Sequence, residues 1–221
     1  MSTKHLALDL YGTLLSTSST FALLSTLPTL TPTTATSIST LWRTHQLTYT
    51  FRLNSTLTYL PFIIITELSL KHALHDHSIA FTSDHISAIM ALYQSSLSVF
   101  PDVAELLDGI AARGNAVVDA RVFSNGDMGM INAALSGEGA EVVRSRVESG
   151  VLKEPVSVDA VGRYKPAKET YELCRERVGK EVQPRDMVLV SSNPFDIVGA
   201  AERGWETVWV DREGKGWGDG L

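Results

Sequence analysis

A short segment near the N-terminus carries a carboxylate around which a chemical site can be built. The apolar run 6–8 is followed by Asp9, and turn-forming Gly12 and hydroxyl-bearing Thr13 come shortly after. A continuous apolar run is typical of a buried parallel strand, and open α/β sheets bind ligands at the carboxyl ends of such strands. An ionised carboxylate there needs nearby cations or hydrogen-bond donors. Taken alone, Asp9 fits a capping role as well as a nucleophilic one.

Further polar side chains follow other predicted strands, in an order that suits the same site. Each group lies at the end of a strand or in the loop just beyond it, and its side chains suit an anion or a leaving group. In chain order the groups are Asp9, Ser124-Asn125, Lys165, and Ser191-Ser192-Asn193 with Asp196. Because the carboxyl ends of parallel strands meet at one edge of a sheet, we expect these groups to lie together.

Strands and helices alternate over the second half of the chain, which predicts an α/β fold with a parallel sheet and right-handed crossovers. The predicted strands after the first are 116–123, 156–158, 187–190 and 207–210. The predicted helices are 101–114, 127–135, 167–178 and 196–203. Asp119 and Arg121 fall inside the second strand, where apolar residues are expected, and predict a bulge or a shifted boundary there.

Residues 15–98 contain no convincing strand and interrupt this alternation. Their apolar spacing predicts helices over 37–53, 62–74 and 84–97. The Ser- and Thr-rich part 16–40, with Pro28 and Pro32 as breakers, is interpreted as loop and short helix. The sequence thus predicts a core domain of residues 1–14 and 99–221 and a helical cap domain of residues 15–98, placed over the carboxyl edge of the sheet.

Composition excludes several classes of partner. The 221 residues have a formal net charge of −6 and no basic run, which argues against a nucleic-acid surface. The most apolar stretch, 60–65, contains Pro61 and is far too short to cross a membrane. The single Cys174 cannot form an internal disulfide, and the chain starts almost directly in a predicted strand. We therefore expect a cytoplasmic protein.

The order of the motifs resembles that of the haloacid dehalogenase superfamily, and within it the L-2-haloacid dehalogenase branch. The segments that carry the resemblance are Asp9-Leu10-Tyr11-Gly12-Thr13-Leu14, Leu41-Trp42-Arg43, Ser124-Asn125-Gly126, Tyr164-Lys165-Pro166 with Tyr171, and Ser191-Ser192-Asn193 with Asp196. Phosphatases of the superfamily carry a second Asp where this chain has Tyr11, and their metal loop opens with an acidic residue. The resemblance implies a Rossmann-like parallel-sheet core with an inserted helical cap, and catalysis without a metal or other cofactor.

Carried over by position, the resemblance implies hydrolysis of short L-2-haloalkanoic acids to D-2-hydroxyacids and halide. Asp9 would attack C2 and form an ester, Arg43 would meet the departing halide, and Lys165 would keep Asp9 ionised. Ser124 would hold the substrate carboxylate, and Asp196 would place or activate the water that hydrolyses the ester. The implied catalytic residues are Asp9, Thr13, Arg43, Ser124, Lys165, Tyr171, Ser191, Asn193 and Asp196. The implied substrate-binding residues are Tyr11, Arg43, Leu47, Phe62, Ser124, Asn125 and Phe195.

Two other functions stay open at this point: a phosphatase of the same superfamily, and a catalytically silent relative that binds a small acid or a partner protein. A metal site at His72, His75 and His77 is a further possibility, but no additional ligand or second shell is evident, and we interpret them as a polar helix end. The resemblance also implies a homodimer through the cap, which the apolar stretch 60–65 could support.

Overall fold

A single parallel sheet forms the centre of the molecule. The computed structural model describes residues 3–17, 24 and 30–221. The strands are β1 (Lys4–Asp9), β2 (Val118–Ser124), β3 (Leu152–Ser157), β4 (Met187–Ser191) and β5 (Glu206–Trp209), in the order β3-β2-β1-β4-β5. All neighbouring pairs are parallel, so the predicted α/β class is confirmed. The middle strand, β1, ends in Asp9, with β2 and β4 on its two sides.

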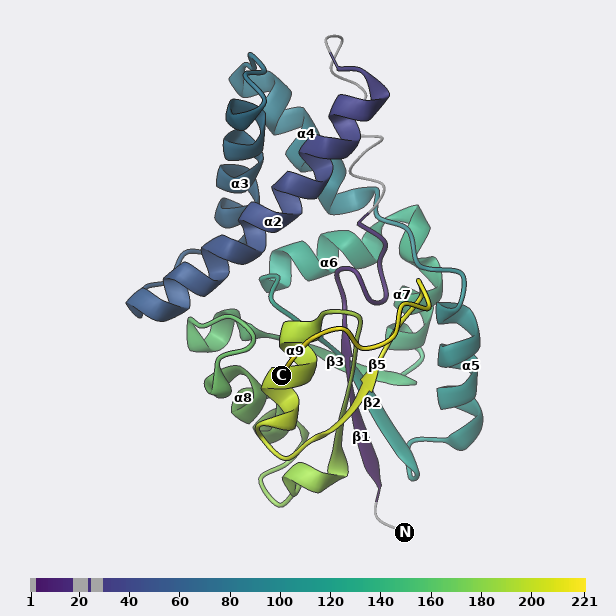
Figure 1. Cartoon of the computed structure of the whole chain (residues 1–221). Helices are drawn as coiled ribbons and strands as arrows, with labels where there is room; N and C mark the ends of the chain where they lie inside the picture. Colours follow the sequence, from purple (N-terminus) through teal and green to yellow (C-terminus); the bar gives the residue numbers. More distant parts are fainter. Residues whose placement is uncertain (1–2, 18–23, 25–29) are drawn as a thin grey trace.

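Helices flank the sheet on both sides, as the alternation predicts (Figure 1). Those that follow or precede the strands are α5 (Val103–Arg113), α6 (Met128–Ser136), α7 (Glu141–Glu148), α8 (Lys168–Val178) and α9 (Pro194–Ala201). Short 3-10 helices cover Glu138–Ala140, Val158–Val161 and Pro184–Asp186. Among the described residues, no helix has the length and apolar character needed to cross a membrane.

The region between β2 and α8 differs most from the prediction. The third strand covers Leu152–Ser157 rather than 156–158, and it includes the polar residues Lys153 and Glu154 together with Pro155. Because β3 lies at the edge of the sheet and pairs only with β2, it tolerates a proline and exposed polar side chains. Helix α7 was not predicted, because its sequence is rich in charge and buries only Val143.

The charged pair in β2 is accommodated within the regular strand. Asp119 and Arg121 are two positions apart, so they lie on the same face of the sheet and form an ion pair of 2.9 Å. His5 of β1 adds a 3.1 Å contact to Asp119. The two charged side chains therefore pair without leaving the strand, so the pair itself does not require a bulge. The predicted irregularity does exist, since the β2–β3 register shifts between Arg121 and Phe123, and the strand begins at Val118.

After β1, the described residues from 30 onwards form helices α2 (Pro32–Thr56), α3 (Phe62–Asp76) and α4 (Ser83–Ser95), which lie beyond the carboxyl edge of the sheet (Figure 1). Helix α2 begins earlier than predicted because Pro32 occupies its first turn, where a proline costs no hydrogen bond, and the Thr31 side chain caps it. The Trp42 indole N–H donates to the carbonyl of Thr66, at 2.8 Å, and joins α2 to α3. Residues 18–23 and 25–29 of the segment interpreted as loop and short helix, including Pro28, lie outside the described residues.

The homodimer remains a prediction. Two residues of the apolar stretch 60–65, Leu60 and Ile64, have 40% and 41% of their surface exposed.

Candidate active site

Asp9 is buried at the carboxyl end of β1 and both of its carboxylate oxygens accept hydrogen bonds. Its side chain is 7% exposed. Oδ2 accepts from the Thr13 hydroxyl at 2.6 Å, from the Ser191 hydroxyl at 3.3 Å and from the Asn193 amide at 2.8 Å. Oδ1 accepts from the Lys165 ammonium at 2.8 Å. This set of a cation and hydrogen-bond donors is what a buried carboxylate requires.

Lys165 brings a buried positive charge between two carboxylates. Its Nζ donates to Asp9 Oδ1, to Asp196 Oδ2 at 2.7 Å and to the carbonyl of Phe123 at 3.1 Å. All three ammonium hydrogens are therefore used, and the side chain is 1% exposed. Burial acts to lower the pKa of Lys165, but the charges of Asp196 and Asp9 outweigh it and raise the pKa above its usual value. Lys165 is a cation at neutral pH.

Asp196 lies in the first turn of α9 and is completely buried. Its Oδ1 accepts a hydrogen bond from the Tyr171 hydroxyl at 2.8 Å, while its Oδ2 accepts from Lys165. Burial raises the pKa of Asp196, and the neighbouring Lys165 offsets only part of this rise. Asp196 is not the cap of α9, because the helix begins at Pro194 and Asn193 takes the cap position.

The loop after β1 folds back on the loop after β4 and aligns the Thr13 hydroxyl. Gly12 has φ +87°, a left-handed conformation that favours glycine. The Ser192 hydroxyl donates to the carbonyl of Gly12 at 2.6 Å, and the Ser192 N–H donates to Thr13 Oγ1 at 2.9 Å. Thr13 is thereby left to donate its own hydrogen to Asp9. Ser192 had no predicted role, although it stands inside the Ser191-Ser192-Asn193 motif.

Arg43 reaches from α2 to the core residues of the site. Its Nη2 donates to Asn193 Oδ1 at 3.3 Å, and the same Asn193 amide donates to Asp9. Its Nη1 donates at 2.7 Å to the buried Gln46, one helical turn further along. Gln46 in turn donates to the hydroxyl of Thr66 on α3 at 2.7 Å. The sequence analysis missed Gln46; its three-residue spacing from Arg43 was the available signal.

Ser124 and Asn125 lie at the end of β2, beside the end of β1, and both are buried. Asn125 Oδ1 accepts the backbone N–H of Lys165 at 2.9 Å, so this side chain positions the lysine. Ser124 Oγ accepts the backbone N–H of Gly126 at 3.0 Å. The two residues were expected near the substrate carboxylate and the halide, and those roles remain predictions.

Aromatic rings gather between the helices and the sheet edge. Tyr11 lies 6.4 Å from Phe62 and stacks on Tyr93 at 6.2 Å, measured between ring centroids. Burial raises the pKa of Tyr11 well above its usual value, so the phenol is neutral. Leu47 is half-buried on α2, four residues after Arg43 and hence on the same helix face.

Phe195 packs its ring against Phe51 of α2 at 5.5 Å, which joins α2 to the first turn of α9. A cavity of about 470 Å³ opens beside Arg43 and is also lined by Trp42, Gln46 and Tyr93. Asp9 does not line this cavity. The Asn193 side chain connects Asp9 to Arg43, and Arg43 forms part of the cavity wall.

All of the predicted catalytic side chains therefore belong to one hydrogen-bonded group or border it. Asp9, Thr13, Lys165, Tyr171, Ser191, Asn193 and Asp196 are linked directly, Arg43 joins through Asn193, and Ser124 lies next to Asn125. The arrangement places the buried Asp9 carboxylate against the Lys165 ammonium. Arg43, from the helical insertion, supplies a second cation.

Known proteins share both the sequence and the fold. The family model described as haloacid dehalogenase-like hydrolase matches residues 3–204. The (S)-2-haloacid dehalogenase 4A of Burkholderia cepacia is 32% identical over 82% of this chain and 72% of its own length. A crystal structure of a dehalogenase with an intermediate complex is 30% identical, covers 96% of this chain and 87% of that one, and has a TM-score of 0.82.

The L-2-haloacid dehalogenase of Xanthobacter autotrophicus with chloropropionic acid covalently bound is also similar. It is 26% identical, covers 96% of this chain and 80% of its own, and has a TM-score of 0.79. With the family match spanning nearly the whole chain, the protein belongs to the haloacid dehalogenase-like hydrolases, in the L-2-haloacid dehalogenase branch, and is a hydrolase acting on carbon–halide bonds.

Proposed function

We propose that this protein is an (S)-2-haloacid dehalogenase that converts short L-2-haloalkanoic acids to D-2-hydroxyacids and halide through an ester on Asp9, without a metal ion. The observation that carries this proposal is the buried Asp9 carboxylate, held by Lys165 and by three further donors. The Xanthobacter autotrophicus relative with covalently bound chloropropionic acid supports a covalent route. The names of the relatives support the substrate class.

In the first step, a carboxylate oxygen of Asp9 attacks C2 of the haloacid from the side opposite the halogen. A C–O bond forms, the C–halogen bond breaks with its electron pair, and C2 is inverted. We assign the attack to Oδ1, because this oxygen accepts one hydrogen bond whereas Oδ2 accepts three. Arg43 is the cation that meets the leaving halide, where negative charge develops.

In the second step, water attacks the carbonyl carbon of the Asp9 ester. The ester C–O bond on the enzyme side breaks, the hydroxyacid leaves, one oxygen from water stays in Asp9 and one proton is released. Asp196 acts on this water, since the raised pKa of its carboxyl makes it a stronger base than an ordinary aspartate. Lys165 and Tyr171 hold Asp196 in place.

The residues of the site do not fit a Mg²⁺ ion, which prefers several hard oxygen ligands in octahedral geometry. The two carboxylates that meet here, Asp9 and Asp196, are already bridged by the Lys165 ammonium at 2.8 and 2.7 Å. The position that a phosphatase would use for a second aspartate holds Tyr11, which is buried and neutral. The proposed reaction therefore proceeds without a metal ion.

The helices of residues 15–98 act as the cap of the proposed two-domain enzyme, and residues 1–14 and 99–221 act as its core. Three contacts support this division of labour. Arg43 bonds to Asn193, Phe51 packs on Phe195, and the Asn54 amide exchanges hydrogen bonds with the backbone of Tyr164, directly before Lys165.

A single turnover in ¹⁸O-labelled water, with enzyme in excess over L-2-chloropropionate, tests the ester. We expect the label in the peptide that contains Asp9, found by mass spectrometry, and unlabelled hydroxyacid. Label in the product alone would mean direct attack by water and would reject the ester. The variant Asp9→Asn is the control, in which we expect chloride release to fall at least about 1000-fold.

Two parallel assays distinguish the remaining functions. Release of phosphate from an aryl phosphate in the presence of Mg²⁺, without chloride release, would identify a phosphatase. Saturable binding of short carboxylates without any turnover would identify a silent binding protein.

A further inference from the structure

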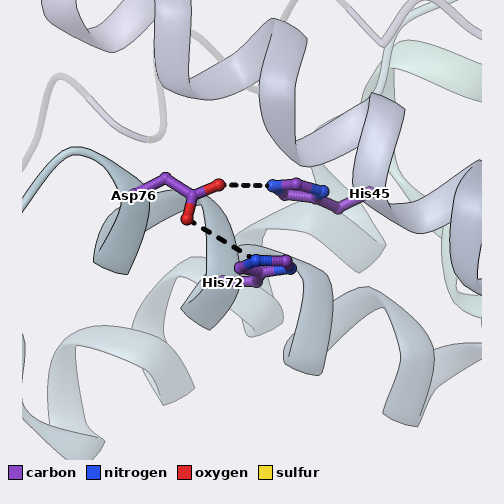
Figure 2. Close-up of side chains that lie close together, drawn as sticks. All are labelled: His45, His72 and Asp76. Carbon is purple, nitrogen blue, oxygen red and sulfur yellow. Dashed lines mark hydrogen bonds and ion pairs between the residues drawn. The ribbon is translucent and has the colours of Figure 1, made fainter.

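Two histidines and an aspartate meet on the helical insertion, on the side of α2 away from Arg43. His45 comes from α2, and His72 and Asp76 come from α3 (Figure 2). His45 lies two residues after Arg43, a rotation of about 200° around the helix, so the two side chains leave α2 on nearly opposite faces. The group therefore lies outside the proposed catalytic machinery.

Each histidine places a ring nitrogen close to the Asp76 carboxylate. His45 Nε2 lies 2.8 Å from Asp76 Oδ2, and His72 Nε2 lies 3.5 Å from Asp76 Oδ1. One ligand atom from each residue can be chosen so that all of them lie within 4.8 Å of one another. The two imidazole rings are stacked at 3.8 Å with an angle of 10°, each with a nitrogen towards the carboxylate (Figure 2). Because the lone pairs of parallel rings do not converge, binding of one ion by both requires one ring to turn about its Cβ–Cγ bond.

These distances suit a transition-metal ion. Zn²⁺ binds imidazole nitrogen and carboxylate oxygen at about 2.0–2.2 Å, so two ligand atoms of a tetrahedral ion are about 3.3 Å apart. The 3.5 Å from His72 Nε2 to Asp76 Oδ1 is close to this spacing, and the 2.8 Å from His45 Nε2 to Asp76 Oδ2 is shorter. Because the two contacts use different carboxylate oxygens, small rotations of the three side chains are needed to bring one atom of each around the ion. Because two of the three ligands are imidazoles, the site favours Zn²⁺, Ni²⁺ or Cu²⁺ over the hard ions Mg²⁺ and Ca²⁺.

Tyr49 contacts the second ring nitrogen of His72. The hydroxyl of Tyr49 lies 2.8 Å from His72 Nδ1. Metal-binding histidines use the nitrogen that faces away from the metal to donate to an oxygen, which fixes the ring and its tautomer. With Nδ1 protonated and donating to Tyr49, the lone pair of His72 Nε2 faces Asp76.

The grouping of histidines by sequence alone was wrong in this respect. His72, His75 and His77 were taken together and no further partner was evident, but the partner His45 lies 27 positions before His72, on another helix. His75 is 86% exposed and its Nδ1 lies 4.0 Å from Asp76 Oδ1, at the limit of an ion pair, and His77 contacts Ser37 instead.

We propose that His45, His72 and Asp76 bind one divalent transition-metal ion of the Zn²⁺ type, which links α2 to α3, with water in the remaining coordination positions. The ion is separate from the catalytic reaction, which uses no metal. Its effect is to fasten the two helices whose packing holds Trp42, Gln46 and Arg43.

Cobalt titration tests the site, because Co²⁺ in a Zn²⁺ site gives visible absorption bands. The full chain without a purification tag is stripped with a chelator, dialysed and titrated with CoCl₂, and ZnCl₂ is then added. We expect one Co²⁺ per chain, displaced by Zn²⁺. We also expect Zn²⁺, and not Mg²⁺, to raise the melting temperature.

Matched variants decide whether these residues are the ligands. We expect His45→Gln and His72→Gln to weaken Co²⁺ binding by about 100-fold or more, and Tyr49→Phe to weaken it by about tenfold. His75→Gln, one residue from Asp76 on the same helix, should bind as the unaltered chain does. Circular dichroism verifies that every variant is folded.

Either of two results would overturn the proposal. One is the absence of saturable Co²⁺ or Zn²⁺ binding up to millimolar concentration. The other is equal loss of binding in His75→Gln and in His45→Gln. Because neither readout uses the haloacid reaction, the outcome is independent of the dehalogenase assignment.

Discussion

Replacement of Lys165 by methionine is the most informative perturbation of the buried charges. Methionine keeps the length and apolar stem of the side chain but removes the cation that serves Asp9, Asp196 and the carbonyl of Phe123. Two buried carboxylates then lose their shared partner, and breaking a buried ion pair in this way costs about 3–5 kcal/mol. For a chain of this length the corresponding fall in melting temperature is about 6–20 °C.

The assay is urea unfolding at pH 7, followed by circular dichroism and by tryptophan fluorescence. Trp205 is a local reporter because its ring lies 5.5 Å from Tyr171 and 6.4 Å from Phe123. The matched control is Lys168→Met, the same change at an exposed position three residues further on, for which we expect less than about 0.5 kcal/mol. If Lys165→Met lowers the free energy of unfolding as little as Lys168→Met does, the reasoning is refuted.

The pH dependence provides an independent check on the cause. Burial raises the pKa of Asp196 even beside Lys165, and removal of the cation raises it further. A carboxyl whose pKa is higher in the folded than in the unfolded state destabilises the fold above that folded pKa, where the buried group is charged. The loss of unfolding free energy in Lys165→Met should therefore be complete at neutral pH. It should become smaller as the pH falls through the raised pKa of Asp196. Adding Asp196→Asn to Lys165→Met should recover about 1–3 kcal/mol at pH 7.

Two further predictions concern residues that pack around the site. A methyl group added in Gly199→Ala, on α9, would clash with the hydroxyl of Tyr171. We expect the free energy of unfolding in urea to fall by about 1–3 kcal/mol, together with slower chloride release. Arg212 donates to the carbonyl of Thr13 at 2.9 Å and forms an ion pair of 2.9 Å with Asp102. We expect Arg212→Ala to lose about 1–2 kcal/mol by the same measurement, and an unchanged midpoint would mean that these contacts do not support the nucleophile loop.

The sheet and the order of its motifs were predictable because each depends on local pattern. Apolar runs identified β1, β2 and β4, and the residues directly after them had to meet at one edge. The elements that escaped prediction lack such a pattern. Helix α7 presents charged residues with only Val143 buried, and β3 carries Pro155 that only an edge strand tolerates.

The supporting side chains of the site were less predictable, because packing between distant segments selects them. Ser192 orients Thr13 across 179 positions, and Gln46 fixes Arg43 only because Thr66 of another helix holds the amide. Serine and glutamine are common residues, and their hydrogen-bond partners are decided by the tertiary fold. The same holds for His45, which becomes a neighbour of His72 only when α2 packs on α3.

Asn193 is the residue of the loop after β4 that supports the proposed reaction without a metal. Its amide donates from Nδ2 to the Asp9 carboxylate and accepts at Oδ1 from Arg43, so an anion on one side and a cation on the other fix its orientation. An aspartate at this position would place a second negative charge against Asp9, and only an added cation would relieve the repulsion. Lys165 already occupies the place between Asp9 and Asp196. The neutral amide therefore links Asp9 to the helical insertion without changing the charge balance, which supports the proposed displacement of halide.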